Sequence, residues 1–365
     1  MGVLIVALAL LLVPDLRPGR RHRLDLTGVA LATAALLCIT FGLIEGERYD
    51  WGRVYSFVTI PGVLGAGALL LAVFFVIQDL RQGREPLLPF AVFRDRNYSL
   101  MTLVLAAMGF AMLGLFLPLT IYLQSVLGLS ALQAGLTILP QPLAMMFVAG
   151  SAGSLADRFG GKYILMAGLA LFACGMAYVD WVAGPDSGRW DFLPALILSG
   201  IGLGCVWGPA YSLATRNLMP HLAGVASGVL NTIQELGTVV ASAAVGALLQ
   251  NRLAVALQDQ AERRAREIPP QLRERFLGGF SRASERGLRV GAGQTGGDPR
   301  LPSGAPVERL ERIAHQVFTH GFVDAMHPTL ILPILVVLAA AASCLAIQGN
   351  PKPRPQTSEQ PEDAP

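Results

Sequence analysis

Few side chains in this sequence could do chemistry, because only 15% of its 365 residues are Asp, Glu, Lys or Arg. One compact group is formed by Asp157, Arg158 and Lys162, which share a short link with Gly160 and lie between two long apolar runs. Such a link leaves no room for a soluble domain. Its charges are therefore expected to cap helices, hold neighbouring helices together or control how helices move past one another.

A second candidate is Glu235, the acidic residue near the middle of an apolar run. A carboxyl group in a low-dielectric environment holds a proton more readily than one in water, so Glu235 could take up and release a proton near neutral pH. Asn231 and Gln234 lie within one helical turn of it and could line the same cavity. Gln124 and Gln141 are further polar groups in or near apolar runs. For each of these residues the alternative role is a structural hydrogen bond to a neighbouring helix.

Three histidines near the C-terminus raise the possibility of a metal site. His315, His320 and His327 are spaced by five and seven residues, with Asp324 between the last two, whereas adjacent ligands on one helical face need a spacing of about four. A cap for the last helix at the membrane surface is favoured, and no metal is predicted. The four cysteines are too dispersed for zinc or a disulfide framework and are predicted to be small buried hydrophobes: Cys38, Cys174, Cys205 and Cys344.

The sequence also argues against nucleotide binding, nucleic-acid binding and catalysis. Residues 291–296 match G-x-G-x-x-G, but no predicted strand precedes them and no helix follows. The arginines of 252–289 are interleaved with glutamates, which is typical of a solvated helical face. No phosphate-binding loop, zinc-protease motif or serine-hydrolase motif occurs. We expect a protein that is not an enzyme and uses no cofactor.

The elements that position the candidate residues are predicted to be membrane helices. The chain is 53% hydrophobic with a mean hydropathy of +0.52, and apolar runs of about twenty residues can cross a hydrocarbon core of about 30 Å. Residues 1–13 would cover only about 20 Å as a helix and are interpreted as the end of a span whose beginning is missing. The full spans are predicted at 27–44, 57–78, 100–124, 134–153, 163–182, 192–214, 222–249 and 328–347.

Lys and Arg cluster in alternate links, which sets the predicted orientation. The basic links, among them 79–99 and 153–162, are placed in the cytoplasm together with the C-terminus. The remaining short links are acidic, mixed or uncharged and are placed outside: 45–53, 125–133 and 180–191. Residues 250–327 also fall outside, since loops longer than about 60 residues cross a membrane largely regardless of their charge.

The outer segment 250–327 is expected to begin and end as helix. Residues 251–268 extend the preceding span until Pro269 and Pro270 stop it. Residues 287–305 are rich in Gly and Pro and predict a loop, and 348–365 are interpreted as a disordered cytoplasmic tail. Apolar residues at helical spacing predict an amphipathic helix that leads into the last span: Leu310, Ile313, Ala314, Val317 and Phe318.

Small residues mark helices that pack closely or bend. Gly200, Gly202 and Gly204 precede Pro209 in one predicted span. The next span carries a face of small residues: Gly237, Ala241, Ala244 and Gly246. Such faces let helix backbones approach one another, and proline permits bending where neighbours re-satisfy the freed carbonyl groups.

In combination these motifs resemble the major facilitator superfamily. Residues 153–162 are similar to its G-x-L-A-D-R-x-G-[RK]-K loop motif at Gly153, Asp157, Arg158, Gly160 and Lys162. Four further stretches narrow the resemblance to the 14-span drug:proton antiporters of that superfamily: 93–97, 117–124, 131–135 and 224–237.

The resemblance implies an all-α polytopic membrane helix bundle. Residues 100–347 would form the C-terminal six-helix half of a major facilitator fold, and 14–99 would hold two linking helices. The implied activity is proton-coupled export of amphipathic drugs or antibiotics across the cell membrane by alternating access. The implied partners are the lipid bilayer, the proton gradient, a small amphipathic substrate and an N-terminal half that this sequence lacks.

Within the loop motif, Asp157 is expected to cap the following helix and to pair with Arg158 or another base, and Lys162 to face the cytoplasmic surface. Two departures from the family pattern bear on the site. Gly161 stands where the motif often has a basic residue, and Gln234 where relatives often have Arg. The proton role of Glu235 is therefore inferred from this sequence and not carried over from the family.

Two classes of function remain open at this point. The first is a transporter, as part of a longer or two-part protein. The second is a non-transporting membrane fragment or accessory subunit, since one half alone provides no opposing wall for a central cavity. A homodimer of halves is a third arrangement.

Overall fold

A computed structural model of the chain describes residues 25–46, 49, 51–55, 58–82, 87–219, 222–265, 273, 276 and 305–347. The side chains of Asp157 and of residues 305–311 lie outside this description, as do the predicted first span at 1–13, the loop at 287–304 and the tail at 348–365.

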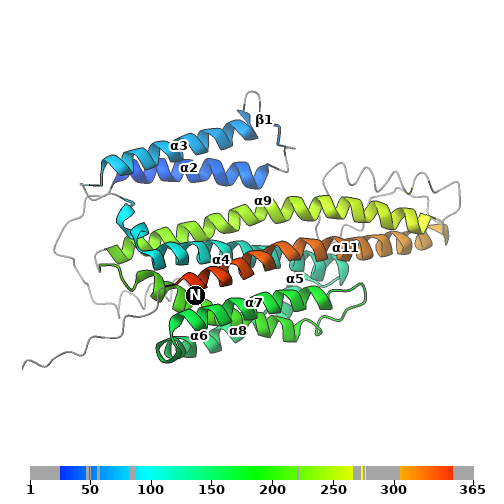
Figure 1. The fold of residues 1–365 in the computed structure, drawn as a ribbon. Coiled ribbons are helices and arrows are strands. Elements are labelled where there is room, and N and C mark those ends of the chain that lie inside the picture. The colour runs from blue at the N-terminus through cyan, green and yellow to red at the C-terminus, as the bar shows by residue number, and fades with distance from the viewer. Residues whose placement is uncertain are drawn as a thin grey trace, which may run out of the picture.

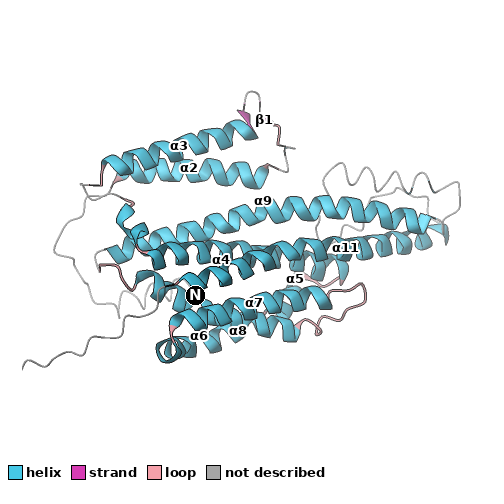
Figure 2. Ribbon diagram, viewed as in Figure 1, coloured by secondary structure: helices cyan, strands magenta, loops and turns pink. Residues whose placement is uncertain are grey.

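The described chain is built almost entirely of helices that run along one common axis (Figures 1 and 2). Its α-helices are α2 (Leu26–Glu45), α3 (Ile60–Leu80), α4 (Arg96–Ile121), α5 (Ala131–Ile138), α6 (Pro140–Phe159), α7 (Gly161–Val182), α8 (Leu193–Thr215), α9 (Ala223–Arg264) and α11 (Ala305–Ser343). Shorter elements are the strands β1 (Arg53–Tyr55) and β2 (Val58–Thr59), the 3-10 turns η2 (Phe90–Arg94) and η6 (Cys344–Ala346), and the π-helical turn η3 (Tyr122–Val126).

Helices α2, α3, α4 and α5 begin at short polar side chains that cap them, whereas α6, α7, α8 and α9 have no side-chain cap. Asp25 caps α2 by accepting from the Gly28 N–H at 2.9 Å. Asp95 caps α4 through the Tyr98 N–H at 2.8 Å. Ser130 and Gln133 bond each other's backbone N–H groups at the start of α5 and form a capping box.

Among the described residues, eight helices are long and apolar enough to cross a membrane. The outward face of α7 shows where lipid would lie, because its exposed residues are apolar and recur at helical spacing: Tyr163, Ala167, Ala170, Cys174, Ala177 and Trp181. Its two aromatic ends are separated by about 27 Å of helix, close to the hydrocarbon thickness of about 30 Å, and aromatic rings favour both membrane interfaces.

Helix α8 is the central packing element between α6 and α7. Gly200 and Gly204 face α6, where an added Cβ would meet backbone and side-chain atoms of that helix. Gly202 faces α7 and lies against Gly168. Since lipid tails are as apolar as the helices, close van der Waals contact of this kind is what holds such a bundle together.

Helices α9 and α11 are much longer than a membrane crossing requires. With 42 and 39 residues they would be about 63 and 58 Å long, about twice the hydrocarbon thickness. We call the bundle end at which α6 meets α7 the motif end, and the opposite end, where α9 and α11 project, the far end (Figure 1). The projecting part of α9 buries a stripe spaced by four residues: Leu249, Leu253, Leu257 and Ala261.

Helices α2 and α3 form an antiparallel pair connected through the β1–β2 hairpin. The pair lies beside α9 at the edge of the bundle (Figure 1) and buries little of its apolar surface. Most of its surface would therefore face lipid or other protein segments.

The prediction of an all-α polytopic bundle is confirmed, and each predicted span from 27–44 onward coincides with an observed helix. The helical extension after 250 is confirmed as far as Arg264, and the amphipathic segment before the last span is continuous with that span as α11. One detail was wrong, because Cys174 is exposed on the outward face of α7. Within the span predicted at 134–153, the chain passes from α5 to α6 through Leu139, whose backbone dihedral angles stay helical, so residues 131–156 form one candidate membrane span.

Candidate functional site

The link between α6 and α7 consists of a single residue. Gly160 has φ +94°, a conformation open to glycine and strained for residues with a Cβ, and Gly161 already begins α7. Gly161 lies 3.4 Å, measured from an ideal Cβ, from the side chain of Leu213 at the end of α8. The expected tight turn is confirmed, and it sets the first turn of α7 against α8.

The other residues of the loop motif lie on the last turns of α6. Arg158 is exposed, with its guanidinium carbon 5.6 Å from the ring centroid of Phe159, within cation–π range. Gly153 faces open space. Asp157 is a helical residue of α6, but its side chain lies outside the described part, so its pairing stays a prediction.

Lys162 does not simply face the surface, as the sequence led us to expect. Its Nζ donates to the backbone oxygen of Leu345 at 2.7 Å and lies 3.4 Å from that of Ile347. Leu345 lies in the turn η6 and Ile347 directly follows it, just beyond the end of α11. The loop motif therefore contacts residues that lie 183 and 185 positions away in the sequence, a contact that no spacing rule predicts.

A stripe of polar and small residues lies exposed along α9. Its members follow one another at helical spacing: Gly224, Gly228, Asn231, Thr232 and Glu235. This face differs from the outward face of α7, whose exposed residues are apolar. The structure thus places two of the predicted site residues, Asn231 and Glu235, on one uncovered face of one helix.

Tyr211 joins this stripe to α8. Its hydroxyl donates to Asn231 Oδ1 at 2.6 Å, and its ring stacks on Trp207 with centroids 6.4 Å apart and an interplanar angle of 22°. Asn231 Nδ2 also donates to the Ser227 carbonyl one turn earlier, at 3.0 Å. Helices α8 and α9 otherwise touch little, so this hydrogen bond is their main polar connection among the described residues.

Sequence reasoning missed Tyr211 and Trp207. Aromatic residues within an apolar span look like core residues, and the four-residue spacing that allows their rings to stack is also the spacing of an ordinary helix face. Tyr211 can be told from a core residue only by its hydrogen bond to Asn231, which the tertiary structure shows.

The three predicted glutamines occupy different environments. Gln141 is 1% exposed and donates from Nε2 to Ser199 Oγ on α8 at 2.9 Å, so it serves helix packing and not the α9 face. Gln234 is half-buried at the crossing with α4, where its carbonyl oxygen lies against Gly109. Gln124 is half-buried in η3. The structure does not bring these three side chains together.

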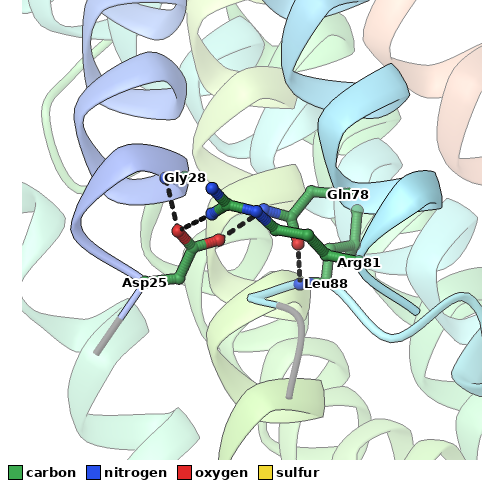
Figure 3. A network of polar contacts seen from close by, with 5 residues as sticks. All are labelled: Asp25, Gly28, Gln78, Arg81 and Leu88. Atoms are coloured by element: carbon green, nitrogen blue, oxygen red, sulfur yellow. Dashed lines mark hydrogen bonds and ion pairs between the residues drawn. The ribbon is translucent and has the colours of Figure 1, made fainter. Parts of the chain in front are cut away.

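A polar network near the motif end was also missed by sequence reasoning (Figure 3). Asp25 accepts from Gln78 Nε2 at 2.8 Å and from the Arg81 guanidinium, and Gln78 Oε1 accepts from the Leu88 N–H. The pKa of Asp25 is lowered, chiefly by the Gly28 N–H, against the opposing effect of burial and with help from Gln78 and Arg81. The sequence feature that could have indicated this network is Gln78, a glutamine at the end of an apolar run.

The C-terminal histidines make separate contacts instead of converging. His327 Nδ1 lies 2.9 Å from Asp180 Oδ1 on α7, His320 contacts Arg264, and His315 contacts Thr319. In the described ranges, no three His, Cys, Asp or Glu side chains are grouped so that they could hold a metal.

Known proteins similar to this chain include membrane transporters. An uncharacterised MFS-type transporter of Mycobacterium tuberculosis is 36% identical over 69% of this chain and 42% of its own length. The tetracenomycin C resistance and export protein of Streptomyces glaucescens is 28% identical over 97% of this chain and 62% of its own. The puromycin resistance protein of Streptomyces alboniger is 33% identical over 68% and 49%. The chain thus spans about half the length of these relatives.

A family model provides the broader classification. The model described as Major Facilitator Superfamily matches residues 1–242, which is well over half of the 365 residues. The match includes the α6–α7 link and the polar stripe of α9. The chain therefore belongs to the major facilitator superfamily, whose helical bundle the observed membrane helices fit.

Proposed function

We propose that this chain forms the two linking helices and the C-terminal six-helix half of a 14-span, proton-coupled exporter of amphipathic drugs or antibiotics in the cell membrane. Two similar proteins are named for antibiotic resistance or export, which supports this class of substrate. Because the chain spans about half of their length, the complete transporter would include a second half, in the same polypeptide or in a partner chain.

The polar stripe of α9 carries the proposal. A carboxylate and an amide are expensive in contact with lipid, so such groups in membrane helices face a water-filled cavity or another protein segment. Glu235 and Asn231 are exposed in this chain, while the exposed face of α7 suits lipid. The α9 face is thus the wall that a substrate cavity requires.

Uncovered glycines support the same assignment. At eight glycines of the described helices an added Cβ would meet no atom within 4 Å, and six of these lie on α6, α8 and α9: Gly150, Gly153, Gly208, Gly224, Gly228 and Gly246. Exposed glycine costs a helix about 1 kcal/mol relative to alanine. Small residues allow another helix to approach closely, so these positions suit contact with the second half in one state of an alternating-access cycle.

In the proposed mechanism Glu235 binds and releases the coupling proton, and the α6–α7 link belongs to a gate on the cytoplasmic side. Moving one charge across a potential of 100 mV provides about 2.3 kcal/mol, which can bias two conformations without ATP. The C-terminus then also lies in the cytoplasm. A substrate would bind between the halves, next to Tyr211 and Asn231.

The test combines export with water access. Cells expressing the chain, alone and together with the N-terminal half of the tetracenomycin C export protein, are assayed for efflux of a fluorescent amphipathic cation. In parallel, Thr232→Cys in the stripe is labelled with a water-soluble maleimide, and native Cys174 on the lipid-facing side of α7 is the control. We expect efflux from the paired halves, and labelling of Cys at 232 but not of Cys174.

Efflux in neither arrangement, or equal protection of both cysteines, would contradict the proposal.

A second candidate function is a non-transporting accessory subunit. It is favoured by the finding that this chain covers only about half of the relatives' length. That candidate predicts membrane insertion and a protected position 232, with no efflux in either arrangement.

A further inference from the structure

Lys162 stands where a cation is unfavourable for its own helix. It is the second residue of α7, and the N-terminal turn of a helix carries a partial positive charge. Its contacts explain this position: Nζ donates to Leu345 O at 2.7 Å, with Ile347 O at 3.4 Å. The ammonium group therefore serves the end of another helix.

The end of the last helix, which we propose to lie in the cytoplasm, needs a hydrogen-bond donor for its last carbonyl groups. The helix tightens into η6, after which Ile347 is extended, with φ −63° and ψ 128°. The last carbonyl groups of a helix have no N–H partner within it and carry partial negative charge. Lysine side chains satisfy such groups well, and here the lysine lies 183 residues away in sequence from Leu345.

The contact also covers the end of the last helix. Cys344 is 0% exposed and Ile347 4% exposed, and the turn η6 packs on α7. Lys162 follows the single-residue link at Gly160, so one side chain ties the α6–α7 turn to the turn η6 that ends the last helix.

We propose that Lys162 is a positioning residue that clamps the end of the last helix to the α6–α7 link, so that the two move as one body during the conformational cycle. Arg158 has a different role in the same motif, because its guanidinium lies over Phe159 on the exposed side of α6. The local clamp can be tested without any transport assay, whereas its role in the cycle depends on the proposed export function.

Native Cys344 is a reporter for the clamp. Cys38, Cys174 and Cys205 are replaced by serine, and the rate of maleimide reaction at Cys344 is measured in the detergent-solubilised full chain. Lys162→Met keeps the aliphatic length but removes the charge and the donor. Its labelling should rise about tenfold or more, the factor expected when a hydrogen bond from a charged donor is lost.

Two matched variants make the result specific. Lys162→Arg can still donate to both carbonyl groups and should restore protection. Arg158→Met removes the neighbouring cation of the same motif and should leave Cys344 protected. The size-exclusion profiles of all variants should match that of the parent protein. If the profile of Lys162→Met differs from it, Lys162→Gln is used in its place.

Continued protection of Cys344 in both Lys162→Met and Lys162→Gln would overturn the proposal. Equal labelling of Cys344 in Lys162→Met and Lys162→Arg would also overturn the proposal. The cysteine would then be covered by packing of the lysine side chain and not by its hydrogen bonds. Where efflux is measurable, Lys162→Met should slow it and Lys162→Arg restore it. Absence of efflux in the parent would count against the export function and leave the labelling result standing.

Discussion

The role of a single residue in this chain depends more on its neighbours in the fold than on its residue type. Glu235 and Gln141 are both polar residues within apolar spans, yet Glu235 is exposed on the α9 stripe and Gln141 is buried against Ser199. Likewise, Arg158 lies over an aromatic ring while Lys162, four residues on, bonds two carbonyl groups. The same motif thus provides a surface group and a structural contact.

The first residue-scale prediction concerns proton coupling. Glu235→Gln keeps the shape of the side chain but cannot be charged, so efflux should lose its dependence on the proton gradient. One coupled proton at 100 mV is worth about 2.3 kcal/mol, or roughly 50-fold in accumulation. The measurement compares efflux before and after adding a protonophore.

The matched control for this prediction is Asp259→Asn, an exposed acid on the projecting part of α9. It should keep the gradient dependence of the parent. A Glu235→Gln protein with unchanged gradient dependence would rule out the coupling role.

The second residue-scale prediction follows from the lowered pKa of Asp25. A carboxyl group with a folded-state pKa below its unfolded value stabilises the fold above about pH 4, and that contribution is lost as the pH falls through the folded-state pKa. Asp25→Asn keeps an N-cap but loses the ionic partner of Arg81, and should be destabilised by about 1–2 kcal/mol at pH 7.

Thermal unfolding of the purified protein at pH 7 and pH 3 checks this sign. The gap between parent and Asp25→Asn should narrow at the lower pH, because the parent has then lost its carboxylate. A gap that stays constant between the two pH values would show that Asp25 acts only as a cap.

At the scale of elements, the helices are held by positions where backbones meet. In the α4–α9 crossing, Gly109 lies against the carbonyl of Gln234, and Gly237 against that of Ala106. This crossing fixes the rotation of α9, and with it the direction of Glu235 two residues before Gly237. By contrast, Gly246 on the same helix has no atom near its missing side chain. Glycine in the sequence therefore marks both packed and uncovered faces.

The prediction at this scale uses that difference. Gly237→Ala places a methyl group on the Ala106 carbonyl and should cost roughly 1–3 kcal/mol, as overpacking does. Gly246→Ala should be neutral or stabilising by up to about 1 kcal/mol, since helix propensity improves without a clash. Thermal unfolding of both variants in the same detergent is the measurement, and an equal effect of the two substitutions would contradict the crossing.

At the scale of the whole molecule, the chain has one side suited to lipid, one side with uncovered polar and small residues, and a projection at the far end. The projection is a pair of helices held by Gln260 with Asp324 at 2.8 Å and by Arg264 with Gln316. Its apolar stripe includes Leu257, which lies against Gly321. The segment that connects α9 to α11 therefore begins and ends on this pair of helices.

The prediction for the projection is a cross-link. An added Cβ at Gly321 would lie 3.3 Å from the Leu257 Cα, so Leu257→Cys with Gly321→Cys should form a disulfide under mild oxidation. Leu257→Cys with His315→Cys is the control, since His315 is exposed and almost two turns away. Mass spectrometry of the joined peptides reads out both, and cross-linking of the control pair alone would contradict the observed register.

The sequence by itself determined the helical class, the spans, the tight turn at Gly160 and the family resemblance. These are local properties: apolar run length, caps and the need for glycine at positive φ follow from neighbouring residues. Tertiary structure alone decided which side chains meet. The pairs Lys162–Leu345, Tyr211–Asn231 and Asp25–Gln78 join residues 20 to 183 positions apart. Which face of a helix is covered depends on the rotation of its neighbours, and no periodicity along one helix contains that information.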